Sequence, residues 1–155
     1  MKKLIILGPG NHGKNYNLLT KGYDKLTHVS KKISKLKNEN DKSCYILTAP
    51  YSYCVVSATI IEQEIGIFKT KTREHGELIW SEDNMKKEYL FSRALEIIKS
   101  RSESIIILIP SHPEFIEKFV QYFAKNELQM EVETSKIGHA EGFMFNIEEK
   151  SFRFI

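Results

Sequence analysis

The chain has 155 residues, of which 41% are hydrophobic, so it is long and apolar enough to form one domain with one sizeable core. Its formal net charge of +3 is too small an excess to indicate binding to nucleic acid or to an anionic membrane surface. Two cysteines make no disulfide framework or metal site, and no apolar run is long enough for a signal peptide or a membrane span. We therefore expect a single cytoplasmic domain over residues 1–155, with reduced thiols and neither metal nor cofactor.

The apolar run at residues 4–7 predicts a first strand, buried on both faces, that ends abruptly in a glycine-rich turn. Gly8, Pro9, Gly10 and Gly13 make this turn irregular. In an open α/β sheet, ligands bind at the carboxyl ends of the strands. The turn is therefore the first candidate for a ligand site.

The segment after this turn predicts a helix, a polar connection and a second strand. Apolar residues at three- and four-residue spacing among lysines are typical of an amphipathic helix over about residues 20–37. The polar residues 35–43 predict a mobile connection, and the apolar residues 44–50 predict a buried strand. Pro50 suits the opening of a further helix, so the order of strand, turn and helix is repeated here.

The middle of the chain predicts a short extended piece, a polar loop and a helix. The extended piece covers residues 65–72, and the loop after it contains Glu74 and Trp80. A helix follows near residues 84–100, and we expect its inward face to carry Met85, Tyr89, Leu95 and Ile98.

The most apolar run, residues 105–109, predicts a central strand that ends in the polar residues Ser111 and His112. One apolar face marks the helix that follows; it carries Ile116, Phe119, Val120 and Phe123. Alternating apolar residues at 143–147, a turn and a second run at 152–155 predict an antiparallel hairpin at the sheet edge. The whole order predicts an α/β fold, a three-layer α/β/α sandwich with a mostly parallel central sheet.

Three of the predicted strand ends are expected to meet in one cleft, because the carboxyl ends of parallel strands lie at the same edge of a sheet. They are residues 8–13, 48–54 and 110–113. This convergence is the main indication of where a site lies.

One interpretation of the first turn is a nucleotide-binding phosphate loop. The letters GPGNHGKN, at residues 8–15, fit the pattern GxxxxGK, with Lys14 placed to reach terminal phosphates. Asn15, however, stands where a serine or threonine ligates magnesium, and no strand ends in the aspartate that holds the same ion. The motif therefore lacks both of its metal ligands.

A second interpretation comes from four segments that resemble, in this order, segments of one known family. The opening of the chain resembles a first strand, an RHG triplet and a first helix, in the segments MKKLIILGPG and LLTKGYDKLTHVSKKI. TAPYSYCVVSATII is similar to an SPxxRAxQTA segment, IIILIPSHPEFIEKFVQYF to a second-histidine motif, and GHAEGFMFNIEEKSFRFI to a closing hairpin. The family is the histidine phosphatase, or phosphoglycerate mutase-like, superfamily. In length and in the lack of a large inserted cap, the chain looks most like the small SixA-type phosphohistidine phosphatases.

The resemblance also implies that most residues of the family's active site are replaced. In that family a histidine at the end of strand 1 attacks phosphorus, and two arginines and a second histidine hold the oxygens. Placed without a gap, the RHG triplet falls on Gly8, Pro9 and Gly10, so that Pro9 stands in place of the nucleophile. Tyr53 stands in place of the second arginine. Since charge-assisted hydrogen bonds contribute about 1.5–3 kcal/mol each, the loss of two arginines removes several kcal/mol of phosphoryl binding.

Two polar residues of the family's active site have counterparts in this chain. A shifted alignment of the RHG triplet gives a counterpart for the nucleophile as well. His112 matches the second histidine, and Glu74 in REHGEL matches the acid of some members. A three-residue insertion after the strand lays NHG over RHG, which makes His12 the phosphoryl acceptor and Asn11 the replacement for arginine. This placement needs one nitrogen of His12 to face phosphorus while a backbone carbonyl holds the other.

The sequence therefore supports two functions besides that of a nucleotide-binding, phosphate-loop-like protein. The first is a degenerate histidine-phosphatase-like protein, a pseudoenzyme that binds a phosphorylated small molecule or a phosphoprotein without the usual phosphohistidine turnover. The second is an active phosphatase or phosphodiesterase in which His12 attacks, His112 holds the phosphoryl group and Glu74 protonates the leaving oxygen. For both we expect the loop amides to contribute, and the ligand to be lined by Gly8, Pro9, Gly10, Asn11, Gly13, Tyr53 and Ser111.

Two histidines have plainer interpretations. His112, between Ser111 and Pro113, is also suited to satisfying backbone groups at the start of a helix. His139 carries no motif and is expected to be an ordinary residue.

Overall fold

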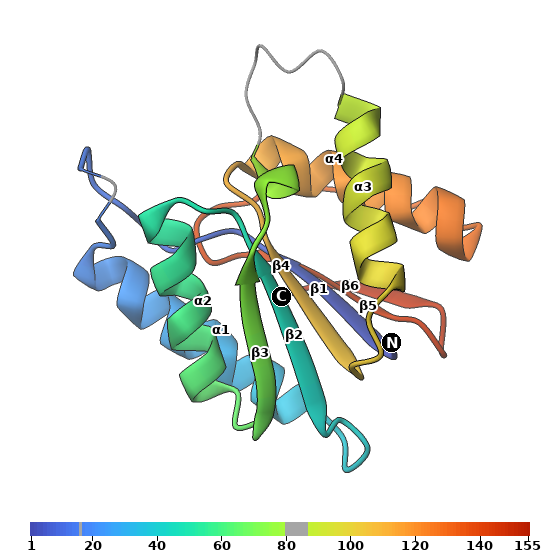
Figure 1. Ribbon diagram of the computed structural model, residues 1–155, viewed down its shortest axis with the longest axis horizontal. Helices are drawn as coiled ribbons and strands as arrows, with labels where there is room; N and C mark the ends of the chain where they lie inside the picture. Colours follow the sequence, from blue (N-terminus) through green and yellow to red (C-terminus); the bar gives the residue numbers. More distant parts are fainter. Residues whose placement is uncertain (16, 80–86) are drawn as a thin grey trace.

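The computed structural model describes residues 1–15, 17–79 and 87–155, which form one six-stranded sheet with helices on both of its faces (Figure 1). The strands are β1 (Lys3–Leu7), β2 (Ser43–Thr48), β3 (Lys69–Glu74), β4 (Ile105–Ile109), β5 (Gly142–Asn146) and β6 (Ser151–Phe154). The helices are α1 (Thr20–Leu36), α2 (Ser52–Glu64), α3 (Lys87–Lys99) and α4 (Pro113–Phe123), with short turns η1 (Gly76–Leu78) and η2 (Ala124–Leu128). The strand order is β3-β2-β4-β1-β5-β6.

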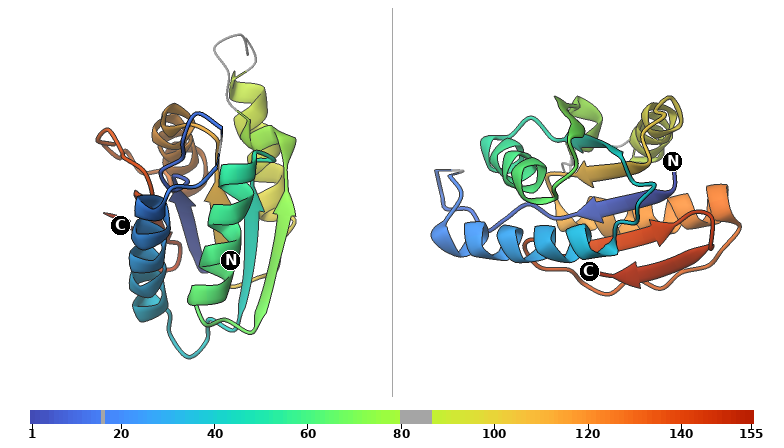
Figure 2. Two further views of the ribbon diagram at one scale, coloured as in Figure 1. Left: turned by 90° about the vertical axis from the view of Figure 1, so that its left-hand side faces the viewer. Right: turned by 90° about the horizontal axis from the view of Figure 1, so that it is seen from below.

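The sheet separates two layers of helices. Figure 2 shows α1 and α2 against one face and α3 and α4 against the other. Strands β1 to β4 pair in parallel, and only the C-terminal hairpin runs antiparallel. This confirms the expected three-layer α/β/α sandwich. Among the described residues, no helix is both long and apolar enough to cross a membrane.

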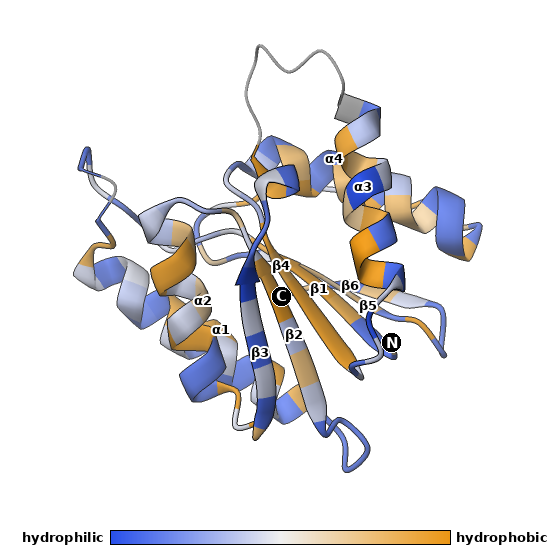
Figure 3. Ribbon diagram, in the orientation of Figure 1, coloured by the Kyte–Doolittle hydropathy of each residue, from blue (hydrophilic) through white to orange (hydrophobic). Residues whose placement is uncertain are grey.

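The core is centred on β4 and β1, the two middle strands. All five residues of each strand are buried, as expected for strands covered by helices on both faces. Figure 3 shows these strands as the most hydrophobic part of the sheet and the edge strand β3 as polar. The sequence prediction of a central strand at residues 105–109 is therefore confirmed.

The C-terminal hairpin lies where the alternating pattern predicted it, at one edge of the sheet. Strand β5 pairs antiparallel with β1, and its first residue, Gly142, lies opposite Leu7. The two backbones approach so closely that a Cβ atom on Gly142 would lie 2.0 Å from the Ile6 carbonyl oxygen. The residues just before β5 are thereby brought to the carboxyl end of β1.

The connection at residues 35–43, which was expected to be polar and mobile, contains a buried ion pair, between Asp41 and the Lys3 side chain at the start of β1. One expectation about α3 was wrong. On α3, Tyr89 is 60% exposed, whereas Leu95 and Ile98 face the core as predicted. The predictions for Trp80 and Met85 fall outside the described residues.

Candidate functional site

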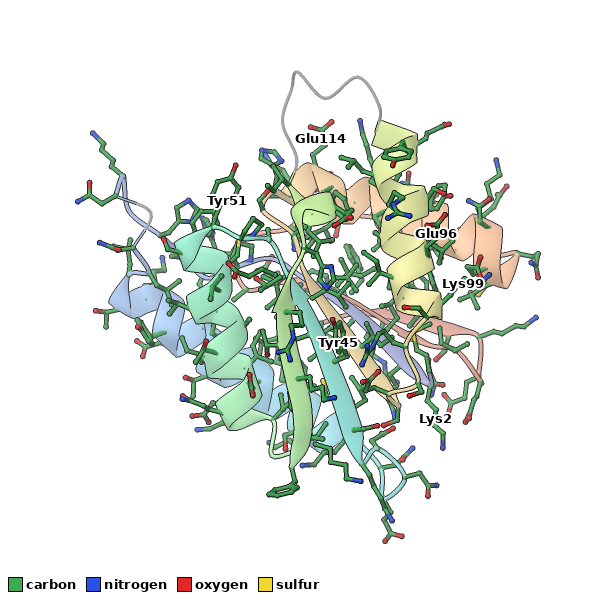
Figure 4. All side chains as sticks on the ribbon, viewed as in Figure 1. Lys2, Tyr45, Tyr51, Glu96, Lys99 and Glu114 are labelled. Atoms are coloured by element: carbon green, nitrogen blue, oxygen red, sulfur yellow. The ribbon has the colours of Figure 1, made fainter. Side chains whose placement is uncertain are left out.

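A small pocket lies where β1 and β4 end, beside the start of the helix α2 that follows β2. These strands are parallel neighbours, so the segments that follow them come together, as the sequence predicted. Tyr51 at the start of α2 and Glu114 at the start of α4 mark this edge in Figure 4. The pocket has a volume of about 100 Å³, and its walls are Gly8, Pro9, His12, Ser111, Pro113, Ile137, Gly138 and His139.

The His12 imidazole lies within a row of rings. It stacks on the Tyr53 ring with centroids 3.9 Å apart and planes 12° apart. Tyr51 stacks in turn on Tyr53, with centroids 5.8 Å apart. On the other side, His139 meets His12 edge to face at 5.8 Å. The structure therefore brings His12 into the same pocket as Pro9.

Tyr53 and Ser57 on α2 hold this arrangement against the rest of the sheet. The Tyr53 hydroxyl donates to the Ser111 carbonyl oxygen at 3.3 Å, which ties α2 to the end of β4. The buried Ser57 hydroxyl accepts from the Gly10 amide at 3.0 Å and donates to the Tyr53 carbonyl at 2.6 Å. One helix thus positions both the glycine turn and the ring against which His12 lies.

The amides of the glycine turn are not arranged as a phosphate cradle. The amide of Gly8 donates to the Glu141 carbonyl at 2.9 Å, that of Gly10 to Ser57, and that of Gly13 to the Asn17 carbonyl at 2.9 Å. All three donors are satisfied by the protein. The Gly10 and Gly13 amides, which the sequence analysis expected to contribute to ligand binding, therefore already have acceptors within the protein, as does the Gly8 amide.

Close packing explains two glycines, Gly10 in the turn and Gly22 on α1. A Cβ atom on Gly10 would lie 2.7 Å from the Leu26 side chain, and one on Gly22 would lie 2.6 Å from the Asn11 carbonyl oxygen. The turn needs small residues because it lies directly on α1. The Asn11 backbone carbonyl accepts from Leu19, and its side-chain oxygen is buried without a partner among the described residues.

The geometry around Lys14 differs from that of a phosphate loop. Lys14 is exposed, and the next helix begins only at Thr20. A phosphate loop instead places its lysine at the start of the helix, whose amides then face the phosphates.

His112 and Glu74 lie outside the walls of the pocket. His112 is exposed and caps α4, where its Nδ1 accepts from the Glu114 amide at 3.1 Å. Glu74 ends the edge strand β3, three strand positions from β1 and roughly 14 Å away at about 4.8 Å per strand. The structure therefore does not bring the predicted catalytic residues His12, His112 and Glu74 together around the pocket.

The pocket walls at residues 137–139 were missed by the sequence analysis, which treated His139, the titratable one of them, as an ordinary residue. His139 precedes β5, and because β5 runs antiparallel beside β1, this segment lies at the carboxyl end of β1. Burial, the neighbouring His12 and the Lys25 ammonium lower the pKa of His139 below its usual value of 6.5. The sequence contained one indication of this position, the predicted antiparallel hairpin at the sheet edge, because the chain that leads into β5 must pass the carboxyl end of β1.

The pocket's electrostatics rest on two imidazoles. No lysine or arginine is among its walls, and among the described residues no cluster of three metal-binding side chains occurs anywhere. The nearby Cys54 is fully buried, and desolvation raises its pKa to about 12, so its thiol stays protonated. The pocket is therefore small, and its described walls carry no titratable side chain other than the two imidazoles, whose nitrogens can hydrogen-bond with a ligand or exchange a proton with it.

No protein-family model matches the chain, and no curated protein matches it significantly. Solved structures do match. YhfR of Bacillus stearothermophilus is similar with a TM-score of 0.66 at 13% identity, over 99% of this chain and 95% of that one. The protein histidine phosphatase SixA, in complex with tungstate, is similar with a TM-score of 0.62 at 13% identity, over 99% and 94% of the chains.

A phosphoglycerate mutase from Plasmodium falciparum is similar with a TM-score of 0.54 at 13% identity, over 100% of this chain and 90% of that one. At such identities the likeness is one of fold, and it extends over the full described sheet and its helices. The chain has the phosphoglycerate mutase-like fold, the fold of the histidine phosphatase superfamily.

Proposed function

We propose that the chain binds a phosphorylated small molecule or a phosphorylated protein in the pocket between His12 and His139, without turning it over through the usual phosphohistidine. The observation that carries this proposal is the residue just beyond β1. Pro9 lines the pocket where the resemblance expects the nucleophile, and proline has no side-chain group that can attack phosphorus.

The size and polarity of the pocket support a single phosphoryl group as the bound moiety. A volume of about 100 Å³ equals the liquid volume of roughly three water molecules at about 30 Å³ each. The imidazoles of His12 and His139 supply donors, and they supply charge only when protonated. SixA, which shares the fold, has been solved with tungstate, an oxyanion of similar shape. Without a guanidinium among the pocket walls, binding should be weak and should depend on pH.

A second candidate function follows from the position of His12. Its imidazole lines the same pocket as Pro9, so it could act as a displaced nucleophile. A nitrogen of His12 would form a bond to phosphorus as the ester P–O bond breaks, and the leaving oxygen would take a proton. Water would then hydrolyse the phosphohistidine. His139 faces His12 at 5.8 Å between ring centroids, and in its protonated form it would supply the proton to the leaving oxygen.

Turnover assays distinguish the two functions. Purified protein is incubated with p-nitrophenyl phosphate and with acetyl phosphate, and both released product and acid-labile phosphate on the chain are measured. We expect neither product nor phosphorylated protein. Turnover that disappears in His12→Ala but persists in His112→Ala would overturn the binding function in favour of the displaced nucleophile.

Binding is tested separately with inorganic phosphate and phenyl phosphate. We expect millimolar concentrations to raise the thermal midpoint and to shift the ring proton resonances of His12 and His139, since a ligand stabilises the state it binds. The exposed His112 serves as the internal control, and its ring resonance should move less. If neither compound shifts the midpoint or the resonances, the proposal is wrong.

A further inference from the structure

A second and larger cleft lies on the other side of His139, between α1 and the C-terminal hairpin. Its volume is about 340 Å³, within the range of roughly 300–1,000 Å³ that is typical of small-molecule sites. Its walls come from one face of α1, from His139 and the two residues after it, and from the end of β6.

One side of the cleft is a single face of α1. Lys25, His28 and Lys32 follow at helical spacing, so their side chains lie on one stripe beside the buried Val29. The opposite side comes from the end of the hairpin, where Ile155 exchanges backbone hydrogen bonds with Gly142. The α1 side is regular helix, whereas the other side joins the turn before β5 to the end of β6, where the backbone hydrogen bonds between Ile155 and Gly142 hold the chain.

The chemistry of the cleft favours an uncharged, largely apolar occupant. Val29 and Ile155 are buried at its base, and the half-exposed Phe154 ring forms part of its rim. The lysines at positions 25 and 32 are balanced by the carboxylates of Asp24 and Glu141. The Glu141 carboxylate already accepts from the Gly138 amide at 2.7 Å.

The cleft and the small pocket meet at His139, which is a wall of both. The imidazole of His139 interacts electrostatically with groups on both sides, because His12 in the pocket and Lys25 in the cleft both lower its pKa. A molecule with its phosphoryl group in the pocket would therefore pass His139 and place its remaining part at the mouth of the cleft.

We propose that the cleft between α1 and the hairpin binds the organic group of the phosphorylated ligand. The ligand class is a phosphate monoester of an aromatic or largely apolar alcohol, with the phosphoryl group beside His12 and the bridging oxygen beside His139. This inference rests on the proposed function and adds the substrate class to it.

The test compares 1-naphthyl phosphate with inorganic phosphate at one pH, with the ring resonances of His12 and His139 as the readout. Because the naphthyl ring buries apolar surface, we expect it to bind at least about tenfold more tightly than phosphate. His28→Trp fills the cleft from an exposed helical position and should reduce this preference to about twofold or less. Lys31→Trp places the same bulk on an exposed position of α1 outside the cleft and should keep the preference.

Failure of the inference differs from failure of the proposed function. If phosphate binds, but the naphthyl ester binds no more tightly or His28→Trp keeps the preference, the cleft is not the site of the organic group. If neither compound perturbs His12 and His139, both the pocket and the cleft are excluded as a phosphate ester site.

Discussion

The imidazole of His139 is surrounded by groups that disfavour its protonation. Partial burial removes water from the ring, and the neighbouring His12 and Lys25 oppose a further positive charge. The Pro9 carbonyl and the Glu141 carboxylate act in the opposite direction, but the net effect lowers the pKa below 6.5. His139 is therefore mainly neutral at pH 7 and gains a positive charge only in more acidic solution.

This pKa predicts how anion binding changes with pH. Sulfate is a suitable probe, because its charge does not change between pH 8 and pH 5, and its affinity should rise as the pH falls below 6.5. The lowered pKa of His139 also predicts that the free energy of unfolding decreases as the pH falls below 6.5, because the unfolded chain takes up the proton at a higher pH than the folded chain. Histidine NMR titration gives the pKa, and His139→Gln should flatten the sulfate profile. An unchanged profile in that variant would show that His139 does not control binding.

Ser57 is the second residue with a measurable role. Ser57→Ala leaves the buried Gly10 amide without an acceptor, and an unsatisfied buried donor costs about 1–3 kcal/mol. Urea denaturation should show this loss. Thr59→Ala is a matched control on α2, because the exposed Thr59 hydroxyl donates only to the Val55 carbonyl four residues earlier, at 3.0 Å. Equal losses in the two variants would contradict the role assigned to Ser57.

At the scale of elements, α1 and the glycine turn form a closely packed pair. The backbone of the turn lies against Gly22, and the side chains of Leu18 and Leu26 leave no space for a side chain at Gly10. Leu19 donates to the Asn11 carbonyl at 2.8 Å, which fixes the turn to the start of the helix. The position of His12 therefore depends on the packing of α1 against this turn.

This packing predicts that a usually favourable substitution will be harmful. In an open helix, glycine to alanine stabilises by roughly 1 kcal/mol, but a Cβ atom at position 22 would lie 2.7 Å from the Asn11 amide nitrogen. Gly22→Ala should lower the thermal midpoint and shift the His12 ring resonances. Gly76→Ala, where a Cβ atom meets nothing within 4 Å, is the control and should do neither. A higher midpoint in Gly22→Ala would disprove the close contact.

At the scale of the whole molecule, the ion pair between Lys3 and Asp41 joins parts of the chain that are far apart in sequence. Its side chains are 6% and 0% exposed, and the Asn38 amide donates to the same carboxylate at 2.8 Å. The pair links the first residue of the central strand β1 to the connection between α1 and β2. The pair lies at the amino end of β1, which is the end of the strand opposite the pocket.

Breaking this pair should be costly for global stability. Asp41→Ala leaves an uncompensated buried ammonium, and removing one partner of a buried pair costs about 3–5 kcal/mol. Glu96→Ala breaks the exposed pair with Arg93 and should cost less than about 0.5 kcal/mol. The double variant Lys3→Met with Asp41→Leu should regain most of the loss, since no charge is left buried. Chemical denaturation measures all three, and equal costs for the two single variants would refute the buried role.

Much of the fold followed from local pattern. The apolar run at residues 105–109 has no polar interruption, so only a strand covered on both faces suits it, and β4 is such a strand. The spacing on α1 and α4 likewise places their apolar residues on the buried face. Tyr89 departs from this pattern because an aromatic ring at an inward spacing can still lie beyond the edge of the core.

The site was less predictable, because side-chain contacts between distant segments have no local pattern. His12 was found from its place after the first strand, and the structure puts it in the pocket. His112 satisfies a backbone amide of its own helix, and Glu74 ends a strand at the far edge of the sheet. Strand order, which no single segment encodes, decided how far Glu74 lies from β1.

The sequence by itself determined the elements, their order and the edge of the sheet at which the pocket lies, because apolar periodicity and chain direction are local properties. The tertiary structure alone decided that Gly10 packs against α1 without space for a side chain, and that the amides of Gly8, Gly10 and Gly13 are already hydrogen-bonded within the protein. It also decided that His139, from the antiparallel approach to β5, faces His12. Such contacts depend on which strands become neighbours, and that is settled only when the whole sheet assembles around its core.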